Sequence, residues 1–345
     1  MRNDSRDDVI DIAKGIGILL VVLGHINHGW LNHLIYLFHM PLFFFLSGSS
    51  LIYARKGFRI GTKIRTIIVP YFTFSIITFL YWLLLEQRFR PIHSPQLFSG
   101  VFGELSTSSQ QFLNIFVALA KNDAFLYNVP LWFLPCLFVS LYIYHLLCKF
   151  DSKYKTLMIM TISVFGFFLN SYRIILPWCL EIAIVALPFI WFGNLFYEYY
   201  RNARWYLEWG GMSLILFSLF VVLLNPLSVD MLNHKYGNWW IFYIVAFLGI
   251  VVTIMLCRCI AQAKITALQW LGRNSLLIMC VHEPIKRIIL KVMSIVGGIE
   301  ITTIRTSIMG SLLCLTCVIF LIIPIVLFIN RYVPFLIGAH HKTNS

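Results

Sequence analysis

The stretch DIAKGIGILLVVLGHINHGWLNHLIYLFHMPLFFFLSG, residues 11–48, decides how the chain is interpreted. It contains two long apolar runs on either side of a short hinge at residues 29–33, and each run holds a histidine, His25 or His39. If both runs are membrane-crossing helices, His25 lies about 7 Å and His39 about 9 Å from the turn. Histidine is costly within a bilayer and usually faces protein or water. Two histidines at nearly one depth therefore predict a functional site; the alternative is that each only hydrogen-bonds to neighbouring groups.

The composition is that of an integral membrane protein. Of 345 residues, 59% are hydrophobic and only 12% are charged, and the mean hydropathy is +0.82. Soluble domains are nearer half apolar and about a quarter charged. Apolar runs of about 20 residues, enough to cross a bilayer, recur from end to end. We predict an all-α, polytopic fold in the lipid bilayer with about ten transmembrane helices, both termini cytoplasmic, and a single domain over residues 1–345.

Ten apolar runs are predicted to span the membrane. They cover residues 10–30, 34–54, 66–85, 130–149, 156–170, 178–197, 209–224, 239–257, 266–281 and 307–329. Pro70 is expected to kink the third run near its start. The longest polar insertion, residues 86–130, is predicted to lie outside. Within it, residues 112–120 are apolar but too short to span, which indicates a helix at the membrane surface.

The net charge of +13 follows from membrane topology. The basic residues lie mostly in short loops between apolar runs, most densely at residues 55–65. Cytoplasmic loops carry this excess of Lys and Arg, so nucleic acid is not expected as a partner. The basic residues 286–291 break the trend, because they follow His282 in a predicted outer segment.

Further polar residues are predicted to reach the outer half of the membrane. A ninth span that starts at residue 266 places His282 about 24 Å along its helix, near the outer end. We predict a pocket whose catalytic candidates are His25, His39, His282, Glu181 and Glu283, and whose substrate-binding candidate is Trp132; Asp11, at the inner face, is a second substrate-binding candidate. The alternative is an interfacial belt, where Trp and polar residues gather without forming a site.

A histidine that titrates near neutral pH suits general-base catalysis. Three histidines can also bind zinc, but the chain has no HExxH or comparable spacing. The eight cysteines lie mostly in or beside apolar runs and have no companion ligands in polar loops. We therefore expect neither a metal site nor a disulfide framework.

A second group of charged residues is predicted at the inner face. Asp11 and Lys14 are three residues apart and can pair on one side of a helix. Lys14, Lys63 and Arg65 lie near the cytoplasmic boundary, and clustered cations suit phosphate groups. The alternative is that these cations only set the topology.

Six motifs occur in order along the chain: DIAKGIGILLVVLGH (11–25), FHMPLFFFLSG (38–48), KIRTIIVPY (63–71), PLWFLPCLF (130–138), LPFIWFGNLF (187–196) and LGRNSLLIMCVHEP (271–284). Together they resemble the motifs of the acyltransferase-3 family of membrane acyltransferases, in particular its fucose 4-O-acetylase-like branch. They cover nearly the whole chain, and they are specific for the family but not for the substrate.

The resemblance implies a multi-pass protein of the bacterial inner membrane with about ten helices. It implies a cytoplasmic acyl-CoA donor, most often acetyl-CoA, and an acceptor hydroxyl on an envelope glycan, such as an O-antigen, capsule or exopolysaccharide sugar, or on its lipid-linked form. His25 corresponds to the essential histidine, and Lys14, Lys63 and Arg65 to donor-binding positions, although many relatives have arginine where this chain has Lys14. The sequence leaves an oligomer open.

Two other classes of protein stay open from the residues alone. A proton-coupled transporter of a glycan precursor or small solute would use the histidines as a proton relay, but we find no internal repeat of the transporter kind. A non-catalytic membrane scaffold or sensor gives no reason for the matched depths of the histidines.

Overall fold

The computed structural model describes residues 7–53, 58–87, 106–121, 124–196, 205–223, 229–263 and 265–339. Over these residues the chain is helical, with no β-strand and one isolated antiparallel bridge between Asp230 and Lys235. The predicted all-helical fold is confirmed. Residues 55–57 of the inner basic loop, and residues 88–105 and 122–123 of the predicted outer loop, lie outside the described residues.

The first half of the described chain contains eight α-helices. They are α1 (Asp8–Ile26), α2 (Trp30–Tyr36), α3 (His39–Tyr53), α4 (Ile60–Lys63), α5 (Val69–Tyr81), α7 (Thr107–Val117), α8 (Phe133–Leu147) and α9 (Ser152–Ser171). Two π-helical segments, η1 (Ile64–Ile68) and η2 (Trp82–Glu86), flank α5, and the 3₁₀ turn η4 (Val129–Trp132) precedes α8.

The second half of the described chain starts at a 3₁₀ turn and ends in another. Its elements are η5 (Pro177–Cys179), α10 (Leu180–Val185), α11 (Leu187–Leu195), α12 (Trp205–Leu223), α13 (Trp239–Ala261), α14 (Thr266–Arg273), α15 (Ser275–Gly297), α16 (Ile301–Thr306), α17 (Ile308–Tyr332) and η7 (Pro334–Ile337).

Several helices are long and apolar enough to cross a membrane. Among the described residues there are 6 of them by length and composition, or up to 7 if the bent pair Pro177–Val185 and Leu187–Leu195 is one span. The 6 are Asp8–Ile26, Trp30–Leu51, Ile60–Glu86, Val129–Leu147, Trp239–Ala261 and Ile308–Tyr332. The chain is therefore a multi-pass membrane protein, but the predicted count of ten spans is not confirmed, and the side of each terminus stays a prediction.

The hinge after the first helix lies earlier than predicted. α1 ends at Ile26 and α2 begins at Trp30, so the turn is at residues 27–29 instead of 29–33. The Oδ1 of Asn27 accepts hydrogen bonds from the backbone N–H groups of Gly29, at 2.8 Å, and Asn32, at 3.3 Å. An Asn side chain that bonds in this way to its own following backbone starts a turn, which ends the helix before the apolar run does.

The predicted ninth span is wrong in its boundaries. It was expected over residues 266–281 with an outer segment after it, but the helix breaks at Asn274, and α15 then continues through Pro284 to Gly297. The charged residues after His282 therefore lie inside a helix. Hydropathy alone misplaced this boundary, because several of those charged side chains are buried against partners within the protein.

Two smaller expectations concern Pro70 and the apolar segment 112–120. Pro70 follows the π-helical segment η1, whose wider turn accommodates a residue that has no N–H group. A short helix is present, but it is offset from the apolar segment: α7 covers Thr107–Val117 and begins after Ser106, whose hydroxyl accepts from the Ser109 N–H. It ends at Ala118, a residue with φ of 51°. Its position at the membrane surface stays a prediction.

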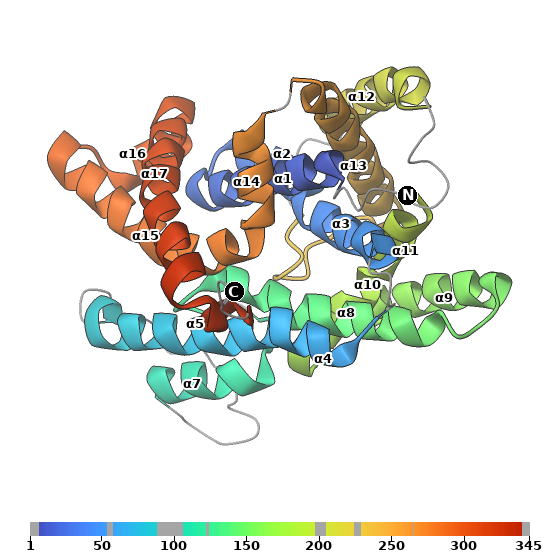
Figure 1. Cartoon of the computed structure of the whole chain (residues 1–345), viewed down its shortest axis with the longest axis horizontal. Coiled ribbons are helices and arrows are strands. Elements are labelled where there is room, and N and C mark those ends of the chain that lie inside the picture. The colour runs from blue at the N-terminus through green and yellow to red at the C-terminus, as the bar shows by residue number, and fades with distance from the viewer. Residues whose placement is uncertain are drawn as a thin grey trace, which may run out of the picture.

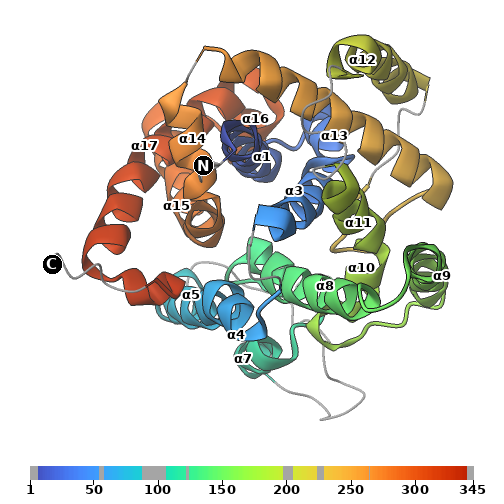
Figure 2. The same cartoon turned by 45° about the vertical axis from the view of Figure 1, so that its right-hand side comes forward.

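Helix α1 lies at the centre of the fold. It contacts α2 and α3, which follow it in the sequence, and α13, α14, α15 and α17, which lie more than 200 residues further on. Figure 1 shows it crossing the middle of the molecule, and Figure 2 shows it nearly end-on, with α14, α15, α3 and α13 around it. The residues of α1 therefore face protein on most sides, and its amino and carboxyl ends are fixed by different neighbours.

Glycines allow the closest helix crossings around α1 and α3. A Cβ atom on Gly272 would collide with the backbone carbonyl of Asp11, and one on Gly15 with that of Leu268, so α1 and α14 touch backbone to backbone. A second reciprocal pair, Gly48 and Gly193, brings α3 and α11 together in the same way. Without a hydrophobic driving force between helices in lipid, small residues at the crossings supply the packing.

We predict that Gly272→Ala destabilises the protein, because the added methyl group must push α14 away from α1. Overpacking of this kind costs about 1–3 kcal/mol, which will appear as a lower melting temperature in detergent. Gly61→Ala in α4 is the matched control, since a Cβ at Gly61 meets nothing within 4 Å. Equal melting temperatures for the two variants would contradict the close crossing.

Candidate active site

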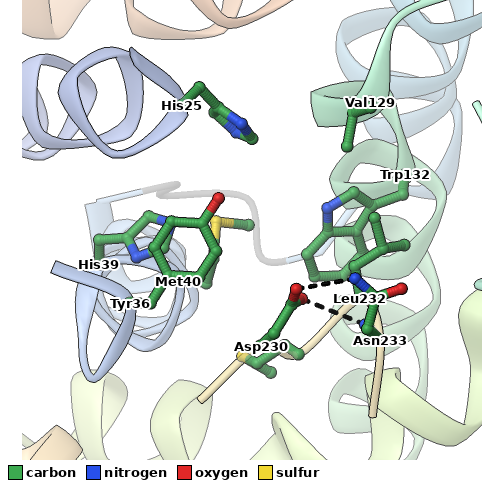
Figure 3. A pocket seen from close by; sticks show the side chains of 10 residues that line it. His25, Tyr36, His39, Met40, Val129, Trp132, Asp230, Leu232 and Asn233 are labelled. Carbon is green, nitrogen blue, oxygen red and sulfur yellow. Dashed lines mark hydrogen bonds between the residues drawn. The ribbon is translucent and has the colours of Figure 1, made fainter. Parts of the chain in front are cut away.

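A cavity of about 200 Å³ opens beside the carboxyl end of α1. Figure 3 shows side chains from three parts of the fold converging on it: the α1–α3 hairpin, the turn η4, and the loop before α13. The lining residues are His25, Tyr36, His39, Met40, Val129, Trp132, Asp230, Met231, Leu232 and Asn233. Three of the predicted site residues, His25, His39 and Trp132, therefore line one cavity.

His25 lies in the last turn of α1, and its ring points into the cavity (Figure 3). The ring lies beside those of His282, with centroids 5.5 Å apart, and Tyr36, with centroids 6.3 Å apart. Within the described part of the chain, neither ring nitrogen of His25 forms a hydrogen bond, so the protein does not hold the ring in one tautomer. The His25 backbone carbonyl accepts from Lys286 Nζ at 3.2 Å and from the Arg305 guanidinium at 3.0 Å.

His39 and His282 are held by backbone carbonyls. The Nδ1 of His39 is 2.9 Å from the Ile35 carbonyl oxygen, and the Nδ1 of His282 is 3.0 Å from that of Met279. Because a carbonyl only accepts, each Nδ1 carries the proton and each neutral ring keeps Nε2 as an acceptor.

The two rings differ in where they lie. His39 lines the cavity next to Tyr36, with ring centroids 4.8 Å apart. His282 is fully buried behind His25, and among the described residues its Nε2 has no hydrogen-bond partner. The structure thus gathers the three predicted histidines, with His282 in a supporting position. No group of three or more His, Cys, Asp or Glu in the described ranges is arranged to hold a metal ion.

Glu283 does not line the cavity but forms the centre of a buried ion network behind it. Its carboxylate accepts from Lys286 Nζ at 2.8 and 2.9 Å and from Arg287 Nε at 3.0 Å. Arg287 also donates to Glu86 and to the Leu126 carbonyl, both at 2.8 Å. The network joins α15 to η2 and to the segment before η4, and through Lys286 it reaches the His25 carbonyl.

Glu181 also lies outside the cavity lining, but it contacts the loop that forms one wall of the cavity. Its side chain is only 1% exposed, and Oε1 accepts from His234 Nε2 at 3.0 Å while Oε2 accepts from the Leu176 N–H at 3.0 Å. His234 belongs to the loop that carries Asp230 and Asn233. Glu181 therefore positions that loop from α10.

Asp11, predicted to bind substrate, lies in a helix contact away from the cavity lining. It is 1% exposed, and its Oδ2 pairs with Arg273 Nε at 2.9 Å, so it joins α1 to α14. This contact with Arg273 was not expected, and the pairing of Asp11 with Lys14 stays a prediction. Lys14 Nζ donates to the hydroxyl of Ser50 on α3, at 3.1 Å.

Lys14, Lys63 and Arg65 lie at the ends of their helices that are remote from His25. Lys14 is 11 residues before His25, which corresponds to about 16 Å along α1. Lys63 and Arg65 begin the long helix whose other end, Glu86, pairs with Arg287 of the network near His25. That helix places them roughly 30 Å or more from Glu86.

Asp230 and Tyr36 line the cavity, but sequence reasoning did not select them. Tyr36 lies in α2, between His25 and His39 in the sequence. An aromatic residue in such an apolar stretch is normally interpreted as a packing residue in the membrane. Asp230 lies in a polar loop that hydropathy assigns to the outside. The one signal for it in the sequence is the spacing Asp-x-x-Asn, which is typical of a turn. In the structure its Oδ1 accepts from the Asn233 N–H at 3.1 Å and its Oδ2 from Asn233 Nδ2 at 2.7 Å.

We predict that Glu283→Gln lowers the free energy of unfolding by about 3–5 kcal/mol, because it leaves the Lys286 ammonium buried without its counter-ion. The double variant Glu283→Gln with Lys286→Met removes both charges and will recover most of that loss. Denaturation in detergent measures both, with Glu300→Gln at an exposed position as the control. A double variant as unstable as the single one would contradict the pairing.

The comparisons with known proteins bear on what this cavity does. A family model, Acyl_transf_3, described as an acyltransferase domain, matches residues 7–336. No curated protein and no solved structure matches the chain. The family match runs from the residue before α1 into η7, so it includes every element that lines the cavity or holds the buried ion network. The chain belongs to the acyltransferase-3 family, and it is a membrane acyltransferase.

Proposed function

We propose that the protein is an O-acetyltransferase of the bacterial inner membrane. It moves the acetyl group of cytoplasmic acetyl-CoA to a sugar hydroxyl of an envelope glycan or of its lipid-linked precursor. The observation that carries the proposal is the His25 ring, which points into the cavity and whose nitrogens have no hydrogen-bond partner among the described residues. The family assignment favours this activity over the transporter alternative.

In the proposed reaction His25 is the general base. One ring nitrogen takes the proton of the acceptor hydroxyl while the oxygen attacks the thioester carbonyl. The new C–O ester bond forms, the C–S bond breaks, and the proton passes from His25 to the departing CoA sulfur. No external oxidant, reductant or metal is required, and the base is restored at the end of each turnover.

His282 and Lys286 support His25 in this scheme without touching the reactants. Among the described residues the Nε2 of His282 has no hydrogen-bond partner, and the centroid of its ring lies 5.5 Å from that of His25. This Nε2 offers an acceptor that stabilises the His25 orientation in which an N–H points back toward α15 and the other nitrogen points into the cavity. Lys286 and Arg305 fix the backbone of the same residue through its carbonyl.

The donor is proposed to reach His25 from the opposite end of α1. Lys14 lies about 16 Å from His25 along this helix, a separation comparable to an extended pantetheine arm. Lys63 and Arg65 also lie at the remote end of their helix. Cations there suit the phosphates of CoA, so the thioester can extend to the histidine while the phosphates stay at the cytoplasmic boundary. Acceptor and donor then approach the cavity from different sides.

We predict that His25→Ala lowers transfer by about 10²–10⁴-fold, the range expected for a lost general base. Purified protein in detergent, acetyl-CoA and envelope glycan are the assay, with release of the CoA thiol and a mass shift of the glycan as readouts. His33→Ala, at an exposed histidine outside the cavity, is the matched control and keeps its activity. A folded His25→Ala protein with near-normal transfer would overturn the proposed mechanism.

We predict that Lys63→Glu and Arg65→Glu each weaken acetyl-CoA binding by about tenfold or more, because a phosphate then meets a like charge. Lys153→Glu, at an exposed position that begins α9, is the control for a general effect of surface charge. Isothermal titration with acetyl-CoA measures the three dissociation constants. Equal losses in all three variants would assign the cations to topology and not to the donor.

A further inference from the structure

The loop Val229–Tyr236, which precedes α13, forms the wall of the cavity that faces His25. Figure 3 shows Asp230, Leu232 and Asn233 across the cavity from the α1–α3 hairpin, with the Asp230 side chain directed into the space between Tyr36 and Trp132. Neither the family match nor the catalytic scheme gives this loop a role. Its chemistry differs from the rest of the lining, because it brings a carboxylate to a cavity otherwise bordered mainly by rings and apolar chains.

The loop is built as a rigid turn. Asp230 and Lys235 exchange two backbone hydrogen bonds of 2.7 and 2.8 Å, and His234 takes a φ of 57° between them. Each oxygen of the Asp230 carboxylate already accepts one bond from Asn233. A carboxylate has about four acceptor positions, so acceptor capacity remains for a molecule in the cavity.

The loop is also anchored from outside the cavity. Besides the bond between His234 and Glu181, Asn170 Nδ2 donates to the His234 carbonyl at 3.1 Å. These contacts hold the loop to α9 and α10 and involve none of the atoms that face the cavity. Asp230 is therefore kept in place whether or not a ligand is present, as expected of a preorganised binding group.

We propose that Asp230 binds hydroxyl groups of the acceptor and selects a neutral sugar residue over an acidic one. A sugar presents hydroxyl donors that a carboxylate accepts, and apolar ring faces that pack on aromatic side chains such as Trp132 and Tyr36. A uronic acid or another anionic sugar would bring a second negative charge into a confined, largely apolar space, which is strongly unfavourable. The inference rests on the proposed function, since it names the class of acceptor at the same cavity.

The test compares neutral and anionic acceptor probes. Methyl glycosides of glucose, galactose, rhamnose and fucose are offered with acetyl-CoA beside methyl glucuronide, and kcat/KM is measured for each. Wild-type protein will prefer at least one neutral glycoside over the glucuronide by tenfold or more. Asp230→Asn keeps the size of the side chain and an acceptor oxygen for Asn233. It will lower the ratio of kcat/KM for the neutral glycoside to kcat/KM for the glucuronide at least tenfold, chiefly by raising KM for the neutral glycoside. Lys235→Gln, an exposed charge on the same loop, is the control and leaves the ratio unchanged.

A second variant separates recognition from positioning. Glu181→Gln loosens the anchor of the loop without changing any group that lines the cavity, so it will raise KM for every glycoside together and leave the neutral-to-anionic ratio as in wild type. If Asp230 only stabilised the turn, Asp230→Asn would behave in this same way, and the proposal would be wrong. Asp230→Ser serves in the same comparison if Asp230→Asn does not fold.

Binding without donor distinguishes this inference from the proposed function. Saturation-transfer NMR detects each glycoside on the protein in the absence of acetyl-CoA. Binding that depends on Asp230, without any acetyl transfer, would overturn the acetyltransferase proposal and leave the sugar site. Transfer to neutral and anionic probes at equal rates, or no binding of any glycoside, would overturn the role of Asp230.

Discussion

The arrangement of the candidate site depends on two cationic side chains that donate to one carbonyl. Lys286 of α15 and Arg305 of α16 both reach the backbone oxygen of His25, and Arg305 also donates to the Ile26 carbonyl at 2.9 Å. The carboxyl end of a helix leaves such carbonyls unpaired and carries a partial negative charge. Cations from α15 and α16 therefore cap α1 where its histidine enters the cavity, and they fix the backbone that carries that ring.

The buried ammonium group of Lys286 is stable only because oppositely charged side chains lie beside it. Glu283 and Glu86 face Lys286 and Arg287, so the buried network brings two acidic and two basic side chains together. Isolated buried charges are costly, whereas paired and hydrogen-bonded ones persist. This also explains why the basic residues after His282 break the positive-inside trend, since two of them act inside the protein and do not set topology.

The opening stretch predicted part of this site, and the reason is local geometry. His25, His39 and the turn between them are close in sequence, so counting the rise of two helices was enough to bring the histidines together. Glu181 and Asp11 are different, because each carboxylate is paired with a residue far away in the sequence. Arg273 is 262 positions from Asp11, for example. Glu283 pairs with Lys286 and Arg287, three and four residues on, and these pairs were missed because the helix was predicted to end at residue 281. The break at Asn274 and the place of Asp230 likewise depend on tertiary contacts that hydropathy does not contain.

The two sides of the cavity are built in different ways, and this has a consequence for how specificity can change. His25 belongs to the central helix, which packs against helices from both ends of the chain and is capped by the buried network, so alterations there disturb the whole fold. Asp230 belongs to a short loop held by contacts from α9 and α10 that do not involve α1. Loops on a rigid scaffold tolerate change that helices do not. Under the proposed function, a different side chain at Asp230 would therefore alter which acceptor is bound while His25 stayed where it is, so the proposed base and the proposed sugar contact lie on physically separable parts of this protein.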